Sequence, residues 1–111
     1  MTRQAYAVFG VLLLLATQPA LAAGPDVEKQ YQEGAAAFAR DDKAQALKIL
    51  RPLAEAGHAG AQQKLAVLYA MGHGGVARDY KQALTWYQNS AAGGNADAQH
   101  QLATAYRNGD Y

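Results

Sequence analysis

The loop from Gly72 to Asp79 holds the residues of this sequence that come nearest to a catalytic pair. His73 has the chemistry of a general base, and Asp79 has that of a carboxylate that orients it. Covalent hydrolysis also needs a serine, threonine or cysteine nucleophile beside the base, and the loop "GHGGVARD" contains none. A small hydrolase is therefore the least favoured function for this chain.

The three histidines, His58, His73 and His100, lack the spacing of a metal site. Zinc ligands on a helix recur at positions i and i+4 or gather with carboxylates, and none of these histidines is so placed. We expect ordinary surface imidazoles, no metal and no cofactor. The glycines from Gly72 to Gly75 lack the Gly-Lys-Ser/Thr ending of a phosphate-binding loop, so they favour a tight reversal between two helices.

Trp86 and Tyr87 are large aromatic residues next to each other in the sequence. On a helix their side chains point about 100° apart, so both can pack into a core against different neighbours. The alternative function for the pair is a platform on which a ligand ring stacks.

Apolar residues recur at helical spacing, and they predict an all-α fold. Ala61, Leu65, Leu68 and Tyr69 share one helix face, and Gly72 follows as a stop signal. The same reasoning along the chain predicts five helices, at about 26–40, 42–56, 59–71, 80–92 and 96–108.

Pro52 lies inside the second predicted helix. It has no amide hydrogen to donate to the carbonyl of Lys48, so we expect a kink or a break near Arg51.

The sequence is similar to itself after a shift of 37 residues. The segment "AEAGHAGAQQKLAVLYAMG" (54–72) aligns with "AAGGNADAQHQLATAYRNG" (91–109), and "DKAQAL" (42–47) aligns with "DYKQAL" (79–84). A fixed period of this kind is typical of helical hairpins that stack, because one hairpin cannot bury both of its apolar faces alone.

The segment "AGHAGAQQKLAVLYAMGHGGVARDYKQALTWYQNSAAGG" resembles one complete Sel-one-like repeat, a tetratricopeptide-like hairpin with a longer internal loop. "YQEGAAAFARDDKAQALKILRPLAEAG" is similar to an ordinary tetratricopeptide hairpin, and "NADAQHQLATAYRNG" resembles the first helix of another Sel-one-like unit. The residues that match the Sel-one-like motif are Gly57, Ala61, Leu65, Leu68, Tyr69, Gly72, Gly75, Val76, Asp79, Ala83, Trp86, Tyr87 and Ala91.

The resemblance implies a right-handed α/α solenoid with a scaffold or adaptor role in contacts between proteins. Its units would be a tetratricopeptide-like hairpin at 23–58, a complete Sel-one-like hairpin at 59–94, and a partial repeat or capping helix at 95–111. The first helix of each hairpin would then line the inner surface of the solenoid.

Three aromatic residues recur at one position of these first helices. On the inner surface they would form a ladder that anchors a partner peptide or helix, with glutamines about two turns before the two tyrosines and an arginine beside the last ring. The alternative is that the rings pack between hairpins. The candidate partner-binding residues are Phe38, Gln62, Tyr69, Gln99, Tyr106 and Arg107.

Residues 1–22 have the composition of a secretory signal peptide, with Arg3, a short apolar run and the small-residue pattern Ala20-Leu21-Ala22. The apolar run is about half of the roughly 20 residues that a membrane-spanning helix needs. We expect cleavage after Ala22, a periplasmic or secreted location, and no membrane insertion after cleavage.

The balanced charge of the exported part gives no electrostatic basis for binding nucleic acid. Removing Arg3 from the ten lysines and arginines leaves nine basic against nine acidic residues, so we expect no nucleic-acid partner. With no cysteine in the chain, disulfides and thiolate metal sites are excluded.

The sequence thus predicts an exported scaffold that binds a protein partner and is not an enzyme. The alternatives are an envelope carbohydrate or peptidoglycan binder and, least favoured, a small secreted hydrolase. We also expect self-association through Leu102 and Tyr106 of the C-terminal helix.

Overall fold

The computed structural model of the protein describes residues 25–109, which form five helices and no strand. The all-α prediction is therefore confirmed for this part of the chain, and the predicted signal peptide lies outside it. The helices are α2 (Pro25–Ala39), α3 (Lys43–Glu55), α4 (Ala59–Met71), α5 (Tyr80–Ala92) and α6 (Ala96–Asn108).

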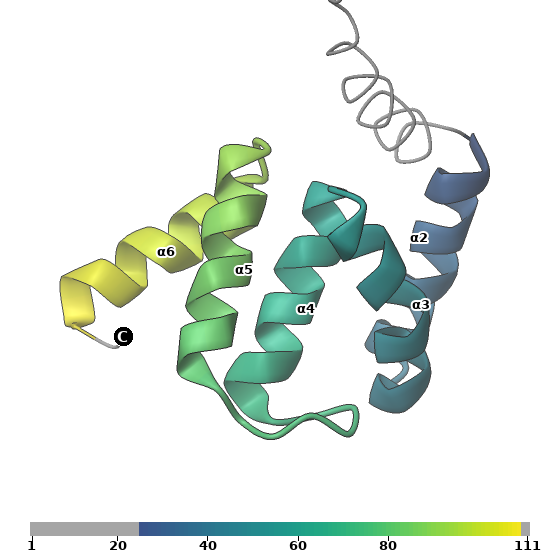
Figure 1. Ribbon diagram of the computed structural model, residues 1–111, viewed down its shortest axis with the longest axis horizontal. Coiled ribbons are helices and arrows are strands. Elements are labelled where there is room, and N and C mark those ends of the chain that lie inside the picture. The colour runs from purple at the N-terminus through teal and green to yellow at the C-terminus, as the bar shows by residue number, and fades with distance from the viewer. Residues whose placement is uncertain (1–24, 110–111) are drawn as a thin grey trace, which may run out of the picture.

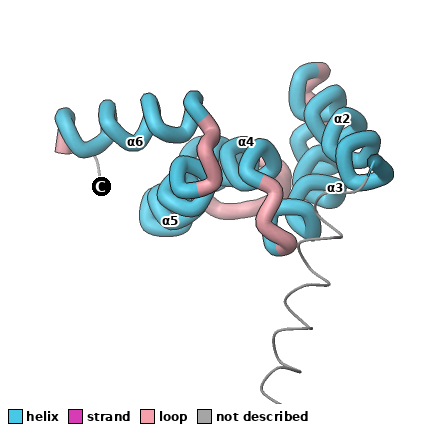
Figure 2. The backbone as a smooth tube through the Cα atoms, turned by 90° about the horizontal axis from the view of Figure 1, so that it is seen from above, coloured by secondary structure: helices cyan, strands magenta, loops and turns pink. Residues whose placement is uncertain are grey.

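The helices follow one another across the molecule in chain order (Figure 1). α2 packs against α3, α3 against α4, α4 against α5, and α5 against α6. α6 diverges from α5 toward its C-terminal end, and seen from above it extends away from the other helices (Figures 1 and 2).

Side chains that precede α3, α4, α5 and α6 fix where these helices begin. Asp42 Oδ1 accepts a hydrogen bond from the Gln45 amide at 3.3 Å, and Asp79 Oδ1 accepts one from the Gln82 amide at 3.1 Å. Each bond satisfies an amide that has no partner inside the helix. α4 ends at Gly72 in the left-handed conformation that glycine adopts without strain.

The core lies where α3 and α4 meet their neighbours. Leu50 on α3 and Leu65 and Leu68 on α4 have no exposed surface. Alanines such as Ala46 and Ala61 are equally buried and allow the helix backbones to approach closely. Both the bulky and the small apolar positions of the repeat are therefore packing positions.

Pro52 does not break its helix. α3 continues through Pro52 to Glu55, so of the kink or break expected near Arg51 the break does not occur. Buried side chains on both sides of the proline, Leu50 and Leu53, hold the two halves of α3 against the core. Their burial outweighs one missing backbone hydrogen bond.

Candidate functional site

Gln62 and Gln99, both predicted to contact a partner, make the same contact one period apart. Gln62 Nε2 donates to the Ala54 carbonyl at 3.1 Å, and Gln99 Nε2 donates to the Ala91 carbonyl at 3.2 Å. Gln62 is buried, with 8% of its surface exposed, whereas Gln99 is exposed. Each glutamine links its own helix to the end of the preceding one.

Tyr69 and Tyr106 also occupy equivalent positions. The Tyr69 hydroxyl accepts a hydrogen bond from Arg51 Nη2 at 3.1 Å, and the Tyr106 hydroxyl accepts one from Gln88 Nε2 at 3.0 Å. Tyr69 is 8% exposed and belongs to the core, while Tyr106 is 46% exposed. Tyr69 therefore packs in the core next to α3, and of these two rings only Tyr106 reaches the surface.

Phe38, the first ring of the predicted aromatic ladder, is half-buried and covered by two lysines. Lys43 Nζ lies 4.0 Å from the centre of the ring, and Lys64 Nζ lies 5.2 Å from it. Lys43 also donates to the Phe38 carbonyl at 2.8 Å. The described structure therefore has two cations over this ring, where an aromatic anchor would present a bare apolar face.

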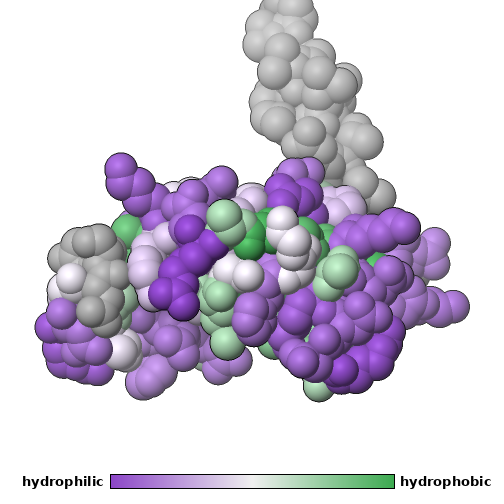
Figure 3. Space-filling view, turned by 90° about the horizontal axis from the view of Figure 1, so that it is seen from below, coloured by the Kyte–Doolittle hydropathy of each residue, from purple (hydrophilic) through white to green (hydrophobic). Residues whose placement is uncertain are grey.

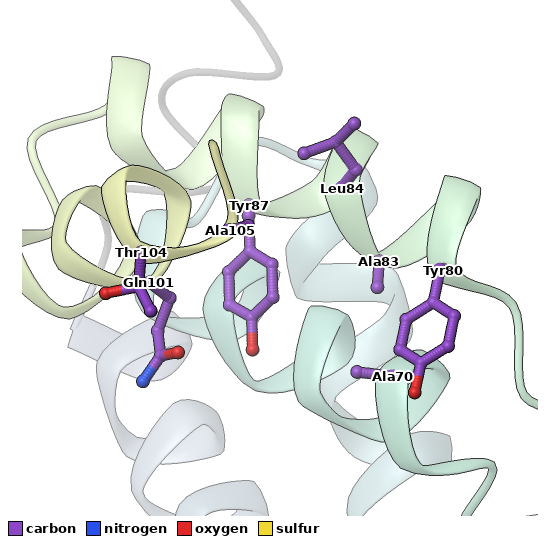
Figure 4. A pocket seen from close by; sticks show the side chains of 8 residues that line it. All are labelled: Ala70, Tyr80, Ala83, Leu84, Tyr87, Gln101, Thr104 and Ala105. Atoms are coloured by element: carbon purple, nitrogen blue, oxygen red, sulfur yellow. The ribbon is translucent and has the colours of Figure 1, made fainter. Parts of the chain in front are cut away.

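An open groove of about 170 Å³ lies between α4, α5 and α6. Figure 4 shows the rings of Tyr80 and Tyr87 projecting from α5 on either side of Ala83, with Gln101 and Thr104 of α6 facing Tyr87. All of its lining residues are uncharged: Ala70, Tyr80, Ala83, Leu84, Tyr87, Gln101, Thr104 and Ala105.

One residue that lines the groove is smaller on α6 than its counterpart on α4. Ala105 stands where α4 has the fully buried Leu68, and Thr104 stands where α4 has Val67, which has the same shape without the hydroxyl. The shorter Ala105 side chain leaves room in the groove that a leucine would fill. These two replacements are visible in the sequence alignment, but the sequence alone does not show the groove.

Hydrogen-bonding groups are placed at the edges of this apolar groove. Tyr87 offers a phenol hydroxyl there, and burial raises its pKa. Arg107, a predicted binding residue, donates from Nη2 to Thr104 Oγ1 at 3.3 Å. The guanidinium is thereby held beside the groove and remains exposed.

His58 is not an ordinary surface imidazole, contrary to the prediction. Its Nδ1 accepts a hydrogen bond from the Ala61 amide at 3.1 Å and so caps α4. Its ring stacks on Tyr31 at a centroid distance of 4.4 Å, and Nε2 lies 3.5 Å from Glu28 Oε1. With only 15% of its side chain exposed, His58 connects α2 to the start of α4.

Two substitutions of His58 distinguish the contribution of its capping hydrogen bond from that of its ring stack on Tyr31. His58→Ala removes the cap and the ring stack and is expected to lower the free energy of unfolding by about 1–2 kcal/mol. His58→Asn is expected to lose less than half as much, because Asn95 is the natural cap one period later and accepts from the Ala98 amide at 2.8 Å. Urea unfolding followed by circular dichroism measures both. Equal losses would contradict the capping role.

Asp79, one of the two residues considered as a catalytic pair with His73, has a structural role in the fold. Asp79 uses its carboxylate to cap α5, as described above.

Within residues 25–109, no group of three or more histidine, cysteine, aspartate or glutamate side chains is placed to hold a metal ion. Over the same range no helix combines the length and apolar character needed to cross a bilayer.

Comparisons of the chain with models of protein families, with characterised proteins and with solved structures found no match.

Proposed function

We propose that the chain is an exported scaffold or adaptor that binds a protein partner, built from tetratricopeptide-like and Sel-one-like hairpins stacked into a right-handed α-solenoid. Export to the periplasm or the exterior is proposed from residues 1–22. The observation that carries the binding function is the open, uncharged groove between α4, α5 and α6. Grooves of this kind bind apolar anchors of a partner, with polar groups at the rim to fix orientation.

The repeat architecture is supported by local contacts that recur with the sequence period. The glutamine-to-carbonyl and tyrosine hydroxyl bonds described above each occur twice, 37 residues apart. The capping residues recur in the same way, with Asp42 and Asp79 before α3 and α5, and His58 and Asn95 before α4 and α6. Neither class of contact is required by helix formation alone.

The second candidate is an envelope carbohydrate or peptidoglycan fragment. Tyr80 and Tyr87 offer two rings of one helix to a sugar face, and Gln101 and Thr104 offer hydrogen bonds to its hydroxyls (Figure 4). Trp86, the other aromatic residue considered from the sequence, packs against the core.

Filling the groove tests the proposal. Ala105→Leu restores the side-chain size found at Leu68 and closes the groove, whereas Ala103→Leu adds the same atoms at an exposed position of α6. In affinity capture from envelope extract, the partner is expected to bind the unmodified chain and Ala103→Leu, and to fall at least about tenfold with Ala105→Leu.

The carbohydrate candidate predicts a different result. Muropeptides would then bind the unmodified chain and not Ala105→Leu in isothermal titration calorimetry. Capture of the same proteins by all three forms, with no response to muropeptides, would reject both candidates for this groove.

A further inference from the structure

The start of α4 is capped by an imidazole that can act as a cap in only one protonation state. His58 Nδ1 accepts the hydrogen bond from the Ala61 amide, so this nitrogen carries no proton and the neutral ring has its hydrogen on Nε2. A protonated imidazole donates from both nitrogens and accepts at neither. A proton taken up on Nδ1 therefore breaks the cap.

The other caps of the fold do not share this sensitivity. Asn95, the counterpart of His58 one period later, accepts from the Ala98 amide through a side chain that does not titrate. Asp42 and Asp79 cap α3 and α5 through carboxylates, and carboxylates take up a proton only in stronger acid than imidazoles do. Of these four caps, only that of α4 uses a side chain whose charge changes between about pH 5 and 8.

The His58 ring also holds α2 against the start of α4. It stacks on Tyr31 of α2, as described above. The two rings occupy the space over the first turn of α4, because a Cβ on Gly60 would lie 2.9 Å from Tyr31 Oη and 3.1 Å from His58 Cε1. The cap and the contact between α2 and α4 therefore depend on one orientation of this imidazole.

The titratable groups of the neighbouring elements are carboxylates and one phenol. Glu28 Oε1 of α2 lies 3.5 Å from His58 Nε2. Burial raises the pKa of the Tyr31 phenol, and the charges of Glu28 and then of Asp97 on α6 raise it further. Glu55 is the last residue of α3. Each carboxylate favours a positive imidazole through its charge.

The loss of the cap outweighs these attractions. Glu28 is 60% exposed, so water screens its attraction for an imidazolium, and Asp97 and Glu55 are exposed as well. A positive ring leaves the Ala61 amide without its acceptor and lies at the positive end of the α4 dipole. The first turn of α4 therefore becomes less stable as the pH falls through the range in which imidazoles take up a proton.

We infer that His58 is a pH-sensitive joint between α2 and α4. Above about pH 7 the neutral ring caps α4 and stacks on Tyr31, whereas below about pH 6 the imidazolium leaves the cap. The first turn of α4 then opens and α2 is held less tightly. This inference is independent of the proposed partner, because the groove meets α4 at Ala70, near the other end of the helix.

Amide hydrogen exchange of the full ¹⁵N-labelled chain tests the inference. The protection of the Ala61 amide, corrected for the intrinsic effect of pH on exchange, is expected to fall about fivefold between about pH 7.5 and pH 5. The Ala98 amide, which Asn95 caps, is expected to keep its protection over the same range.

Two substitutions identify the group that responds. His58→Asn keeps a cap that does not titrate, so the protection of the Ala61 amide is expected to be the same at both pH values. Glu28→Gln removes the carboxylate that favours the imidazolium, so the fall is expected to be at least as large as in the unmodified chain.

His73 supplies the matched control for a histidine elsewhere in the chain. It lies in the loop between α4 and α5, at the end of the molecule that Figure 3 views, where most of the surface is hydrophilic. His73→Ala is expected to leave the response of the Ala61 amide to pH unchanged.

Several results would overturn the inference. Constant or rising protection of the Ala61 amide in acid would show that the pair with Glu28 outweighs the cap. An equal fall in His58→Asn, or a fall that disappears in His73→Ala, would assign the response to another group. If His58→Asn does not fold, the ¹⁵N chemical shifts of the His58 ring decide. Nδ1 must be unprotonated at about pH 7.5 and become protonated as the protection of Ala61 is lost, and a proton on Nδ1 at the higher pH contradicts the inference.

Discussion

Leu68→Ala is expected to lower the free energy of unfolding by about 3 kcal/mol. Leu68 has no exposed surface and lies in the core that joins α4 to its neighbours. Its removal takes away apolar burial and leaves a cavity that the surrounding helices cannot fully close. Because a small domain is stabilised by only about 5 kcal/mol or somewhat more, this variant loses most of its stability. Urea unfolding followed by circular dichroism measures the loss.

Met71 supplies the matched control for Leu68. It lies three residues further along α4 and is 50% exposed, so Met71→Ala is expected to change the free energy of unfolding by less than about 0.5 kcal/mol. Similar losses for the two variants would contradict the assignment of Leu68 to the core.

The helix positions could be predicted from the sequence because helix ends favour particular residues, namely capping side chains at the start and glycine at the end. The predicted ranges 59–71, 80–92 and 96–108 coincide with α4, α5 and α6. Asp79 and Asn95 can cap through their side chains, and Gly72 and Gly109 take the left-handed conformation at the ends of α4 and α6. The two earlier helices differ from prediction by one residue at each end.

The surroundings of individual side chains were harder to predict. Helical spacing shows that Gln62 and Tyr69 share a face of α4, but it does not show that α3 covers that face. The capping role of His58 was missed because its imidazole acts as a hydrogen-bond acceptor, as aspartate and asparagine do at the other helix starts. Both features depend on contacts with a neighbouring helix or on the conformation of one side chain.

The groove depends on a combination that a single alignment position does not reveal. The small residues Thr104 and Ala105 lie beside Tyr87 of α5, while Tyr80 lies at the other end of the groove next to Ala70 (Figure 4). A side chain larger than that of Ala83 on α5 would fill part of the groove and cover these residues of α6. The sequence therefore shows the residue types, and the structure shows the space between them.

Gly34→Ala is expected to lower the free energy of unfolding by about 2 kcal/mol, against the usual preference of helices for alanine. A Cβ at Gly34 would lie 2.6 Å from Leu50 Cδ2 and 2.8 Å from Leu50 Cγ, and also 3.0 Å from Ile49 Cγ2. Leu50 is fully buried, so it cannot move aside without disturbing α4. Overpacking at this contact between α2 and α3 outweighs the gain of about 0.5–1 kcal/mol that alanine brings to a helix interior.

Two further variants separate packing from helix propensity at Gly34. Ala36→Gly, at an exposed position of α2, is expected to cost about 1 kcal/mol through propensity alone. In a Leu50→Ala background the clash is removed, so adding Gly34→Ala is expected to be neutral or stabilising, with a coupling of about 2 kcal/mol between the two sites. A stabilising Gly34→Ala in the unmodified chain would show that α2 and α3 have room to separate. The close contact between α2 and α3 would then not be what fixes their spacing.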